Sequence, residues 1–429
     1  MIRNSARFFS TNTTLYQRTF ARRLLVRLVW SNDTVEKKSG FKMWTTYLKN
    51  DKCDSLKTLK EYQDKIMDTV EINGTKKNDL ILNEINQWHF HNPEASLVDT
   101  PTLLIHGYAA SSLAYFRTFS GLSDKIKNLY AIDLPSFGLS NAPPLDFKEK
   151  VSDIKIKLSD DNTKFKISDS NRVDSLDLKK LIGKYEDYYV EKIEDWRKAN
   201  KLEKINLVGH SFGGYISFKY AIKYPDAINR LCLVSPLGME SNIHSVNNNF
   251  ETKKEYPLDL EDPSSRFYAK ERRIPNFLFK NQLNVLRWMG PIGSKLCWNY
   301  INASYRRVPN PLFKEYLFEL LYGKGGMPSV TIDIFTNLFT RSLLARDPIM
   351  DSISKLKAEK VLLLYGEHDW MNNLAGYNMV ESLNQLKPNN NISTIDYANY
   401  VEVPDAGHNL FLDNPQFFNS AVLSFFKAK

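Results

Sequence analysis

Short apolar runs and longer amphipathic segments alternate along this chain from about residue 80 to the C-terminus. Seven of the runs have the length and the flanking turn residues of buried β-strands. They are residues 85–91, 101–107, 129–135, 205–211, 230–236, 360–369 and 400–408. Helix-length segments separate most of them, and this alternation predicts an α/β fold with a mostly parallel central sheet and helices on both faces.

Two segments interrupt the alternation. Residues 141–177 are dense in Lys, Asp and Ser, which predicts an exposed and partly disordered insertion. Residues 240–345 contain no run typical of a buried strand but many aromatic and basic residues, which predicts a helical cap inserted between two strands. We therefore expect a core formed by residues 81–239 and 346–429, preceded by a helical or irregular lead-in at residues 33–80.

The composition indicates a globular protein in a reducing compartment. A chain of 429 residues with 42% hydrophobic residues can bury a substantial core. The three cysteines, Cys53, Cys232 and Cys297, are an odd number without metal-ligand spacing. Neither a disulfide framework nor a zinc site is therefore expected.

The net charge of +9 is concentrated at the N-terminus. Residues 1–32 contain six arginines and no acidic residue, which leaves +3 for the rest of the chain. Without a long basic run elsewhere, we expect no nucleic-acid partner. The arginines alternate with Ser, Thr and short apolar stretches, a composition typical of a mitochondrial targeting segment, although a disordered basic arm has the same charge. No window of about 18 apolar residues predicts a membrane-spanning helix.

The motif with the clearest chemistry is G-x-S-x-G at Gly209–Gly213, with Ser211 at its centre. The same letters also occur in ordinary glycine-rich turns. Here an apolar strand precedes the motif and an amphipathic helix follows it, which is the context in which a sharp turn raises a serine hydroxyl above the sheet edge. We therefore expect Ser211 to be a nucleophile.

A serine nucleophile needs a histidine base, and the histidine needs a carboxylate that fixes its tautomer. Asp369 stands at the end of a predicted strand and His408 follows in the loop after the last strand, so the chain order is Ser, acid, His. Glu367 competes with Asp369 but lies farther from the strand end. The histidines that compete with His408 are His106, His210 and His368.

Acyl transfer also requires hydrogen-bond donors for the developing oxyanion. We expect the backbone N–H of Phe212, directly after the nucleophile, to be one of them. The second is expected from Tyr108, because Gly107 lets the backbone turn after the strand at residues 101–107. This second stretch could also be a simple strand-ending turn. Asp133, after the next strand, is expected to shape a turn.

Six motifs between residue 80 and the C-terminus together resemble the α/β-hydrolase superfamily. They are HGYAAS, DLPSFGLS, GHSFGGY, LLARDPI, GEHDWM and GHNLFLDNP. The set is more narrowly similar to the branch of the fungal mitochondrial cardiolipin-specific phospholipases and the animal abhydrolase-domain proteins four and five. The resemblance places Ser211, Asp369 and His408 on the nucleophile, acid and base.

The resemblance implies an enzyme that removes an acyl chain from cardiolipin or from an N-acyl phospholipid on the matrix side of the inner mitochondrial membrane, without a metal or other cofactor. Some branch members are described as lysophosphatidic acid acyltransferases on the basis of an H-x-x-x-x-D motif, which His408 and Asp413 reproduce here. Because the triad already needs His408, we expect hydrolysis. An acyl-CoA-dependent acyltransferase and a noncatalytic lipid-binding scaffold remain the alternatives.

The expected partners are a phospholipid substrate and an anionic membrane surface, while the sequence leaves the oligomeric state open. Residues 264–290 of the cap interleave aromatic and basic side chains, a composition that suits a membrane interface. The aromatic residues are Phe267, Tyr268, Phe277, Phe279 and Trp288, and the basic ones are Arg266, Lys270, Arg272, Arg273 and Arg287. Aromatic residues at helical spacing also form protein cores, so the segment alone does not decide between the two.

Overall fold

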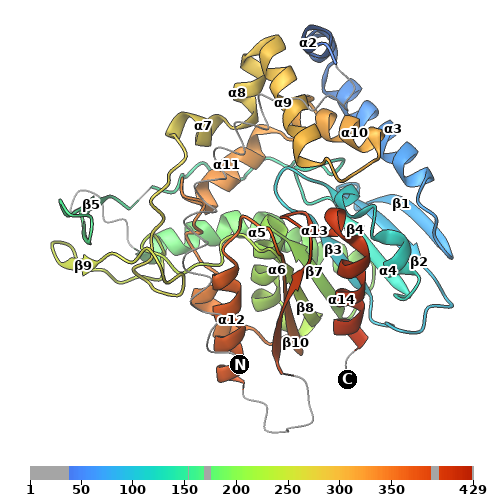
Figure 1. Ribbon diagram of the computed structural model, residues 1–429. Helices are drawn as coiled ribbons and strands as arrows, with labels where there is room; N and C mark the ends of the chain where they lie inside the picture. Colours follow the sequence, from blue (N-terminus) through green and yellow to red (C-terminus); the bar gives the residue numbers. More distant parts are fainter. Residues whose placement is uncertain (1–37, 153, 169–174, 388–395, 428–429) are drawn as a thin grey trace.

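An eight-stranded sheet lies at the centre of the structure, a computed structural model that describes residues 38–152, 154–168, 175–387 and 396–427 (Figure 1). Its strands are, in spatial order, β1 (Thr75–Ile81), β2 (Ile85–His91), β4 (Asn128–Ile132), β3 (Thr102–Ile105), β7 (Ile205–His210), β8 (Ile228–Val234), β10 (Lys360–Gly366) and β11 (Ala398–Val403). β2 runs antiparallel to both of its neighbours, and all pairs from β4 to β11 are parallel. The parallel strands bring their carboxyl ends to one edge of the sheet.

Helices cover both faces of this sheet (Figure 1). They are α4 (Phe119–Ser123), α5 (Ser175–Ala199), α6 (Phe212–Lys223), α12 (Asn373–Leu386), α13 (Leu410–Asp413) and α14 (Pro415–Lys427), with short 3-10 turns η1 (Ser112–Tyr115), η3 (Pro225–Ala227) and η4 (Met350–Lys355). Every residue of β3 and of β7 is buried, as the continuous apolar runs of both strands require. The predicted strands agree with the observed ones to within a few residues.

A helical cap connects β8 to β10. It contains α7 (Asn276–Asn281), α8 (Leu283–Trp288), α9 (Gly290–Ser304), α10 (Pro311–Tyr322) and α11 (Ser329–Leu338). Two N-terminal helices, α2 (Gly40–Lys49) and α3 (Lys52–Asp68), pack against α9 and α10. One continuous cluster of buried side chains joins the sheet, the cap and α3. Among the described residues, no helix has the length and apolar character needed to span a membrane.

The first strand of the sheet lies in the segment that the sequence assigns to the lead-in. β1 reads TKKNDLI, and all of its residues are exposed or half-buried because it is an edge strand that pairs only with β2. The lead-in at residues 33–80 is therefore helical only in part, and the sheet begins before residue 81. The expected targeting segment at residues 1–32 lies outside the described residues.

A second, three-stranded sheet corrects two further expectations. It consists of β5 (Ile156–Leu158), β6 (Lys164–Ile167) and β9 (Glu255–Pro257), all antiparallel. Residues 156–167 of the charged insertion thus form a hairpin, and the cap region at residues 240–345 contains a strand. A small apolar cluster supports this sheet and includes Phe165, Ile243, Phe250, Tyr256 and Ala269.

Candidate active site

Ser211 occupies the sharp turn between β7 and α6. Its backbone has φ 53° and ψ −116°, a left-handed conformation that side-chain-bearing residues rarely adopt. The turn is held on both sides, because Ser211 N donates to Val234 O at 2.9 Å and Leu237 N donates to Ser211 O at 2.9 Å. The strain is therefore built into the site, as expected for a serine raised above a sheet edge.

Both glycines of the motif are required by close packing. A Cβ on Gly209 would stand 2.2 Å from Ser217 Oγ, and one on Gly213 would stand 2.2 Å from His106 O. Such contacts are far shorter than van der Waals distance, so any larger residue would push α6 away from the strands. The spacing G-x-S-x-G thus follows from how tightly the helix meets the sheet.

The structure brings Ser211, His408 and Asp369 together in one hydrogen-bonded chain. His408 Nε2 lies 3.1 Å from Ser211 Oγ, and His408 Nδ1 lies 3.0 Å from Asp369 Oδ1. The three residues follow β7, β11 and β10, whose carboxyl ends meet at the same edge. An ionised carboxylate only accepts hydrogen bonds, so Nδ1 carries the proton and Nε2 is free to accept one from the hydroxyl. This arrangement can deprotonate a serine.

Asp369 is held in its ionised form. Burial alone would raise its pKa, but the electrostatic interaction with His408 and hydrogen bonds from His408, Ser235 and the backbone of Met371 lower the pKa below its ordinary value. Met371 N donates to Oδ1 at 3.0 Å and the Ser235 hydroxyl donates to Oδ2. The Asp369 side chain is completely buried, so these partners replace water as its hydrogen-bond donors.

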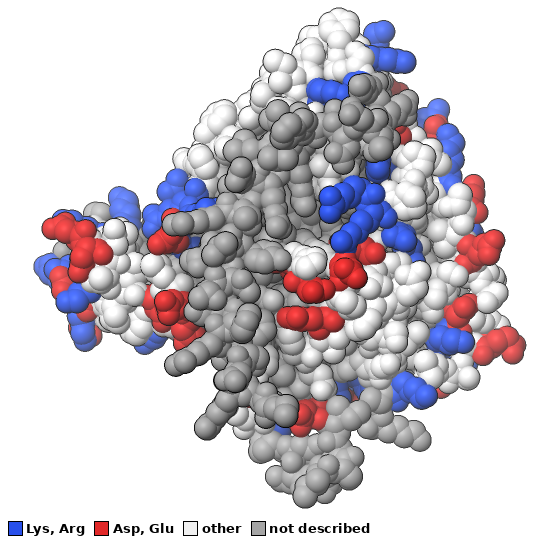
Figure 2. Space-filling model, in the orientation of Figure 1, with Lys and Arg blue, Asp and Glu red and all other residues white. Residues whose placement is uncertain are grey.

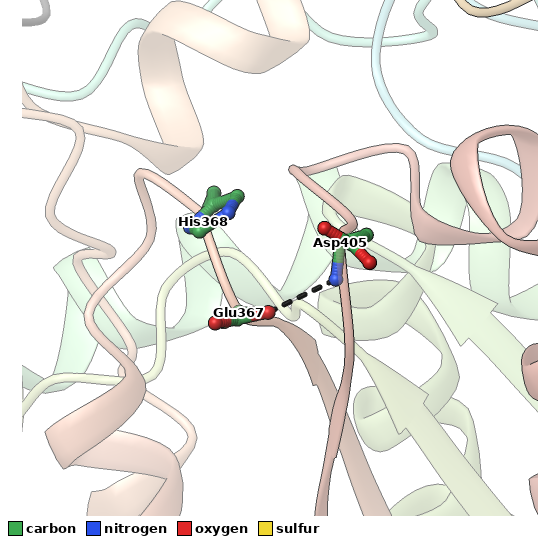
Figure 3. Close-up of side chains that lie close together, drawn as sticks. All are labelled: Glu367, His368 and Asp405. Carbon is green, nitrogen blue, oxygen red and sulfur yellow. Dashed lines mark hydrogen bonds between the residues drawn. The ribbon is translucent and has the colours of Figure 1, made fainter.

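Glu367, the competing acid, is hydrogen-bonded to the backbone of Asp405 (Figure 3). Its Oε2 accepts a hydrogen bond from Asp405 N at 3.0 Å. Glu367, His368 and Asp405 are all exposed, and their ligand atoms lie within 4.8 Å of one another, so among the described residues they form the group that could hold a metal ion. The expectation that the chemistry needs no metal stays a prediction.

Two of the competing histidines have structural roles. His106 is fully buried, donates from Nδ1 to Gly107 O and accepts at Nε2 from Leu134 N, so it joins the ends of β3 and β4 as a neutral ring whose pKa burial lowers. His210 Nε2 donates to the backbone carbonyl of His408 at 2.9 Å. Burial and the neighbouring His408 hold the pKa of His210 well below its ordinary value. His210 thus positions the loop that carries His408.

The two expected oxyanion donors lie beside Ser211. Phe212 begins α6, where N–H groups have no partner within the helix. The turn that carries Tyr108 packs directly on the nucleophile, because a Cβ on Gly107 would stand 3.0 Å from Ser211 Cβ. The Tyr108 ring lies 4.1 Å from that of Phe335 in the cap, and its hydroxyl donates to Gln282 Oε1 at 2.5 Å. Tyr108 therefore also connects the site to the cap.

Asp413 of the H-x-x-x-x-D motif supports the backbone of the histidine loop. Its Oδ2 accepts a hydrogen bond from Gly407 N at 2.9 Å, and burial raises the pKa of this carboxyl. Asp133 has a comparable role after β4, where it accepts from Ser112 N and Leu139 N and shapes the turn as expected. Neither carboxylate is placed to act as a second acid in the Ser211 chain.

Sequence reasoning missed Ser235 and Trp370. Ser235 follows β8, which is the neighbour of β10 in the sheet, and the Trp370 ring lies 4.9 Å from that of His408. The position of Ser235 directly after a predicted strand could have suggested it, since side chains at neighbouring strand ends meet.

Half of the ten interleaved side chains at residues 264–290 are buried or half-buried in the protein. Tyr268 and Phe279 are buried, Phe267 packs on the small apolar cluster, and Lys270 pairs with Glu240 at 2.5 Å. Arg287 donates to the backbone carbonyls at the end of α10. Only Phe277 and Trp288 of the five aromatic residues are exposed.

The family model described as "alpha/beta hydrolase fold" matches residues 100–415, which include all of the residues joined around Ser211. The chain belongs to this family. It is 50% identical to "Protein ECM18" of Saccharomyces cerevisiae over 98% of this chain and 92% of that protein. It is 52% identical to "1-acylglycerol-3-phosphate O-acyltransferase ICT1" of the same yeast over 87% of this chain and 93% of that protein.

The likeness extends to the branch expected from the motifs. Human "1-acylglycerol-3-phosphate O-acyltransferase ABHD5" is 26% identical over 86% of this chain and 89% of its own length. The chain is therefore an α/β-hydrolase-fold protein of the branch that includes abhydrolase-domain protein five, and two of these relatives, ICT1 and ABHD5, carry names from lipid metabolism.

Proposed function

We propose that this protein is a serine hydrolase that deacylates an anionic phospholipid, with cardiolipin as substrate and monolysocardiolipin plus a fatty acid as products. The observation that carries the proposal is the unbroken chain from Ser211 Oγ through His408 to the buried Asp369. A serine joined in this way to a base and a carboxylate is the arrangement that forms acyl-enzymes.

The residues divide the reaction between them. His408 takes the proton of Ser211 as the hydroxyl oxygen attacks the ester carbonyl, and Asp369 stabilises the resulting imidazolium. The N–H groups of Phe212 and Tyr108 donate hydrogen bonds to the carbonyl oxygen and stabilise the negative charge that develops on it. His408 then gives the proton to the departing lysolipid, and water, activated by the same histidine, releases the fatty acid from Ser211.

A second candidate function, 1-acylglycerol-3-phosphate acyltransferase, is favoured by the names of ICT1 and ABHD5. The two functions share the acyl-enzyme and differ in what attacks it: water in one case, a lysophospholipid in the other. The H-x-x-x-x-D motif does not by itself favour transfer, because His408 belongs to the chain with Ser211 and Asp369, while Asp413 holds the backbone of Gly407; we therefore keep hydrolysis as the proposal.

The decisive experiment incubates the purified full chain with vesicles that contain acyl-labelled cardiolipin. Free fatty acid and monolysocardiolipin are expected in buffer alone, and Ser211→Ala should abolish both. A second reaction contains lysophosphatidic acid and labelled acyl-CoA instead. If label enters phosphatidic acid there and no fatty acid leaves cardiolipin in the first reaction, the protein is the acyltransferase. If neither reaction proceeds, the lipid-binding scaffold is favoured.

We further propose that the enzyme works on the matrix side of the inner mitochondrial membrane. The arginine-rich composition of residues 1–32 supports this location. Import of the labelled full chain into isolated mitochondria should give a shorter, protease-protected product. A chain that stays full-length and accessible to protease would contradict the location without affecting the proposed chemistry.

A further inference from the structure

Large apolar side chains gather, exposed, on one end of the cap. The group lies on α7, α8 and the first turn of α9, and α2 adds one more member. We call these residues the apex patch: Phe41, Phe277, Leu278, Trp288, Met289 and Ile292. Trp288 and Ile292 are 63% and 64% exposed, although both are residue types that proteins usually bury in part. Exposed apolar residues that cluster in this way mark a contact surface, whereas scattered ones are ordinary.

Packing between the helices makes the patch continuous. The rings of Phe277 and Trp288 lie 6.0 Å apart, across the bend that joins α7 to α8. α2 lies against α9, where Ser294 Oγ donates to Gly40 O at 2.8 Å. Phe41 and Ile292 therefore stand on neighbouring helices at the same end of the molecule, the top of Figure 1.

The chain segments that carry the patch are predominantly basic. Residues 272–314 contain eight Lys and Arg residues and no acidic residue, and residues 38–50 contain three lysines and no acidic residue. Arg273 and Lys280 beside α7, and Lys42 on α2, are exposed. Figure 2 shows white and blue atoms at the top of the molecule and most of the red atoms lower down. Such a surface is complementary to a layer of negative charge that covers an apolar interior.

The patch is also connected to the candidate active site. Gln282, at the bend between α7 and α8, accepts a hydrogen bond from the Tyr108 hydroxyl. The backbone turn of Tyr108 packs on Ser211. A surface bound at the apex patch thus contacts α7 and α8, and Gln282 between these two helices holds the Tyr108 side chain beside the candidate active site.

We propose that the apex patch docks this protein on an anionic phospholipid bilayer. The side chains of Phe277, Trp288 and Ile292 enter the boundary between headgroups and acyl chains, and the surrounding bases pair with headgroup phosphates. The choice of a phospholipid bilayer over a protein partner rests on the proposed function. The docking surface itself rests on exposure, clustering and charge.

Flotation with vesicles tests the proposal on the full chain. The patch variant carries Phe277→Ser, Trp288→Ser and Ile292→Ser. The matched control carries Leu80→Ser, Leu386→Ser and Phe417→Ser, three exposed apolar residues on β1, α12 and α14. Thermal unfolding of each variant checks that it is folded, since exposed residues contribute little to the core.

The wild type and the control should float with phosphatidylcholine vesicles that contain cardiolipin or phosphatidylglycerol, and less with phosphatidylcholine alone. The patch variant should bind the anionic vesicles at least about tenfold more weakly, because it loses most of its insertable surface. Undiminished vesicle binding by the folded patch variant would overturn the proposal. It would also be overturned if the wild type is a dimer and the patch variant is a monomer, because the patch would then be an interface between two copies of the chain. Flotation does not depend on Ser211, so failure of the proposed catalysis is read separately.

Discussion

At the scale of single residues, Asp369 and Glu367 differ in every property that matters for the proposed chemistry. Asp369 is buried and bonded to His408, whereas Glu367 is exposed and bonded to a backbone N–H (Figure 3). Asp369→Asn should reduce kcat by about 10³–10⁴-fold, because His408 is then held in the wrong tautomer. Glu367→Gln is the matched control and should leave kcat nearly unchanged in the cardiolipin assay. Equal losses in the two variants would contradict the assignment of the acid.

Ser235 is a positioning residue for the same carboxylate. Ser235→Ala removes a buried hydrogen bond to Asp369, which costs about 1–3 kcal/mol, so kcat should fall roughly tenfold or more with little change in KM. Ser217 on α6 is the matched control, because it is also buried and its hydroxyl has no hydrogen-bond partner in the described structure. Ser217→Ala should keep both kinetic constants. An unchanged kcat in Ser235→Ala would show that Ser235 does not position Asp369 for catalysis.

Ser211, Asp369 and His408 could be placed from the sequence because each follows an apolar run in the expected order. Ser235 could not be assigned, because its contact with Asp369 depends on the spatial neighbourhood of β8 and β10. The sequence shows which residues end strands, but not which strands lie next to each other. The role of His210 was hidden for a related reason, since its partner is a backbone carbonyl 198 residues away.

At the scale of elements, the loop between β11 and α13 carries His408 and is tied down by Asp413. Asp413→Ala should lower fatty-acid release and any acyl transfer by the same factor, because both need His408 in place. Asp413→Asn keeps an oxygen that can accept from Gly407 N and should restore most of the rate. Loss of transfer alone, with hydrolysis intact, would show instead that Asp413 serves a transferase mechanism.

The packing of α5 on α6 contains a buried group of charges. Lys219 lies 2.5 Å from Asp347 Oδ2 and 3.2 Å from Glu186 Oε1. Burial raises the pKa of Glu186 to about 7, although Lys219 opposes the shift, while a free glutamate titrates near 4.5. The folded state therefore holds a proton that the unfolded chain releases between these values. Stability conferred by protonated Glu186 is lost as pH rises from about 4.5 to 7.

Glu186→Gln should abolish that loss. The free energy of unfolding of the variant minus that of the wild type should grow by up to about 3 kcal/mol from pH 5 to pH 8, as measured by urea titrations. Glu194 on the same helix is the control, because hydrogen bonds from Arg197 and Tyr220 outweigh the effect of burial and lower its pKa to about 2. Glu194→Gln should change stability by a constant amount over this range. A Glu186→Gln difference that is also independent of pH would contradict the raised pKa.

The elements that the sequence failed to predict are those without a buried apolar run. β1 is a polar edge strand, and β5, β6 and β9 are short strands with exposed charged side chains. β1 pairs with β2 and β5 pairs with β6 across short turns, whereas β9 joins β6 across about 90 residues. The central strands β3, β7, β8 and β10 were predictable because most of their residues are buried and each contains a run of apolar residues.

At the scale of the whole molecule, the cap combines two roles that its composition could not separate. Part of the aromatic and basic segment fills the core around β9 and fastens α8 to α10, and the remainder forms the apex patch with α2. The sequence indicated the correct segment but not the contribution of α2, because residues 38–50 meet the cap only in the folded chain. The proposed membrane surface is thus assembled from two segments that are more than 200 residues apart in the sequence.

The central claim is that Ser211 becomes a nucleophile through His408 and Asp369. The most direct test is mass spectrometry of the full chain after reaction with a fluorophosphonate probe, alongside Ser211→Ala and Asp369→Asn. One covalent adduct is expected on the peptide that contains Ser211, absent from Ser211→Ala and formed far more slowly by Asp369→Asn. An adduct elsewhere, or no adduct on a folded protein that still releases fatty acid from cardiolipin, would contradict the account.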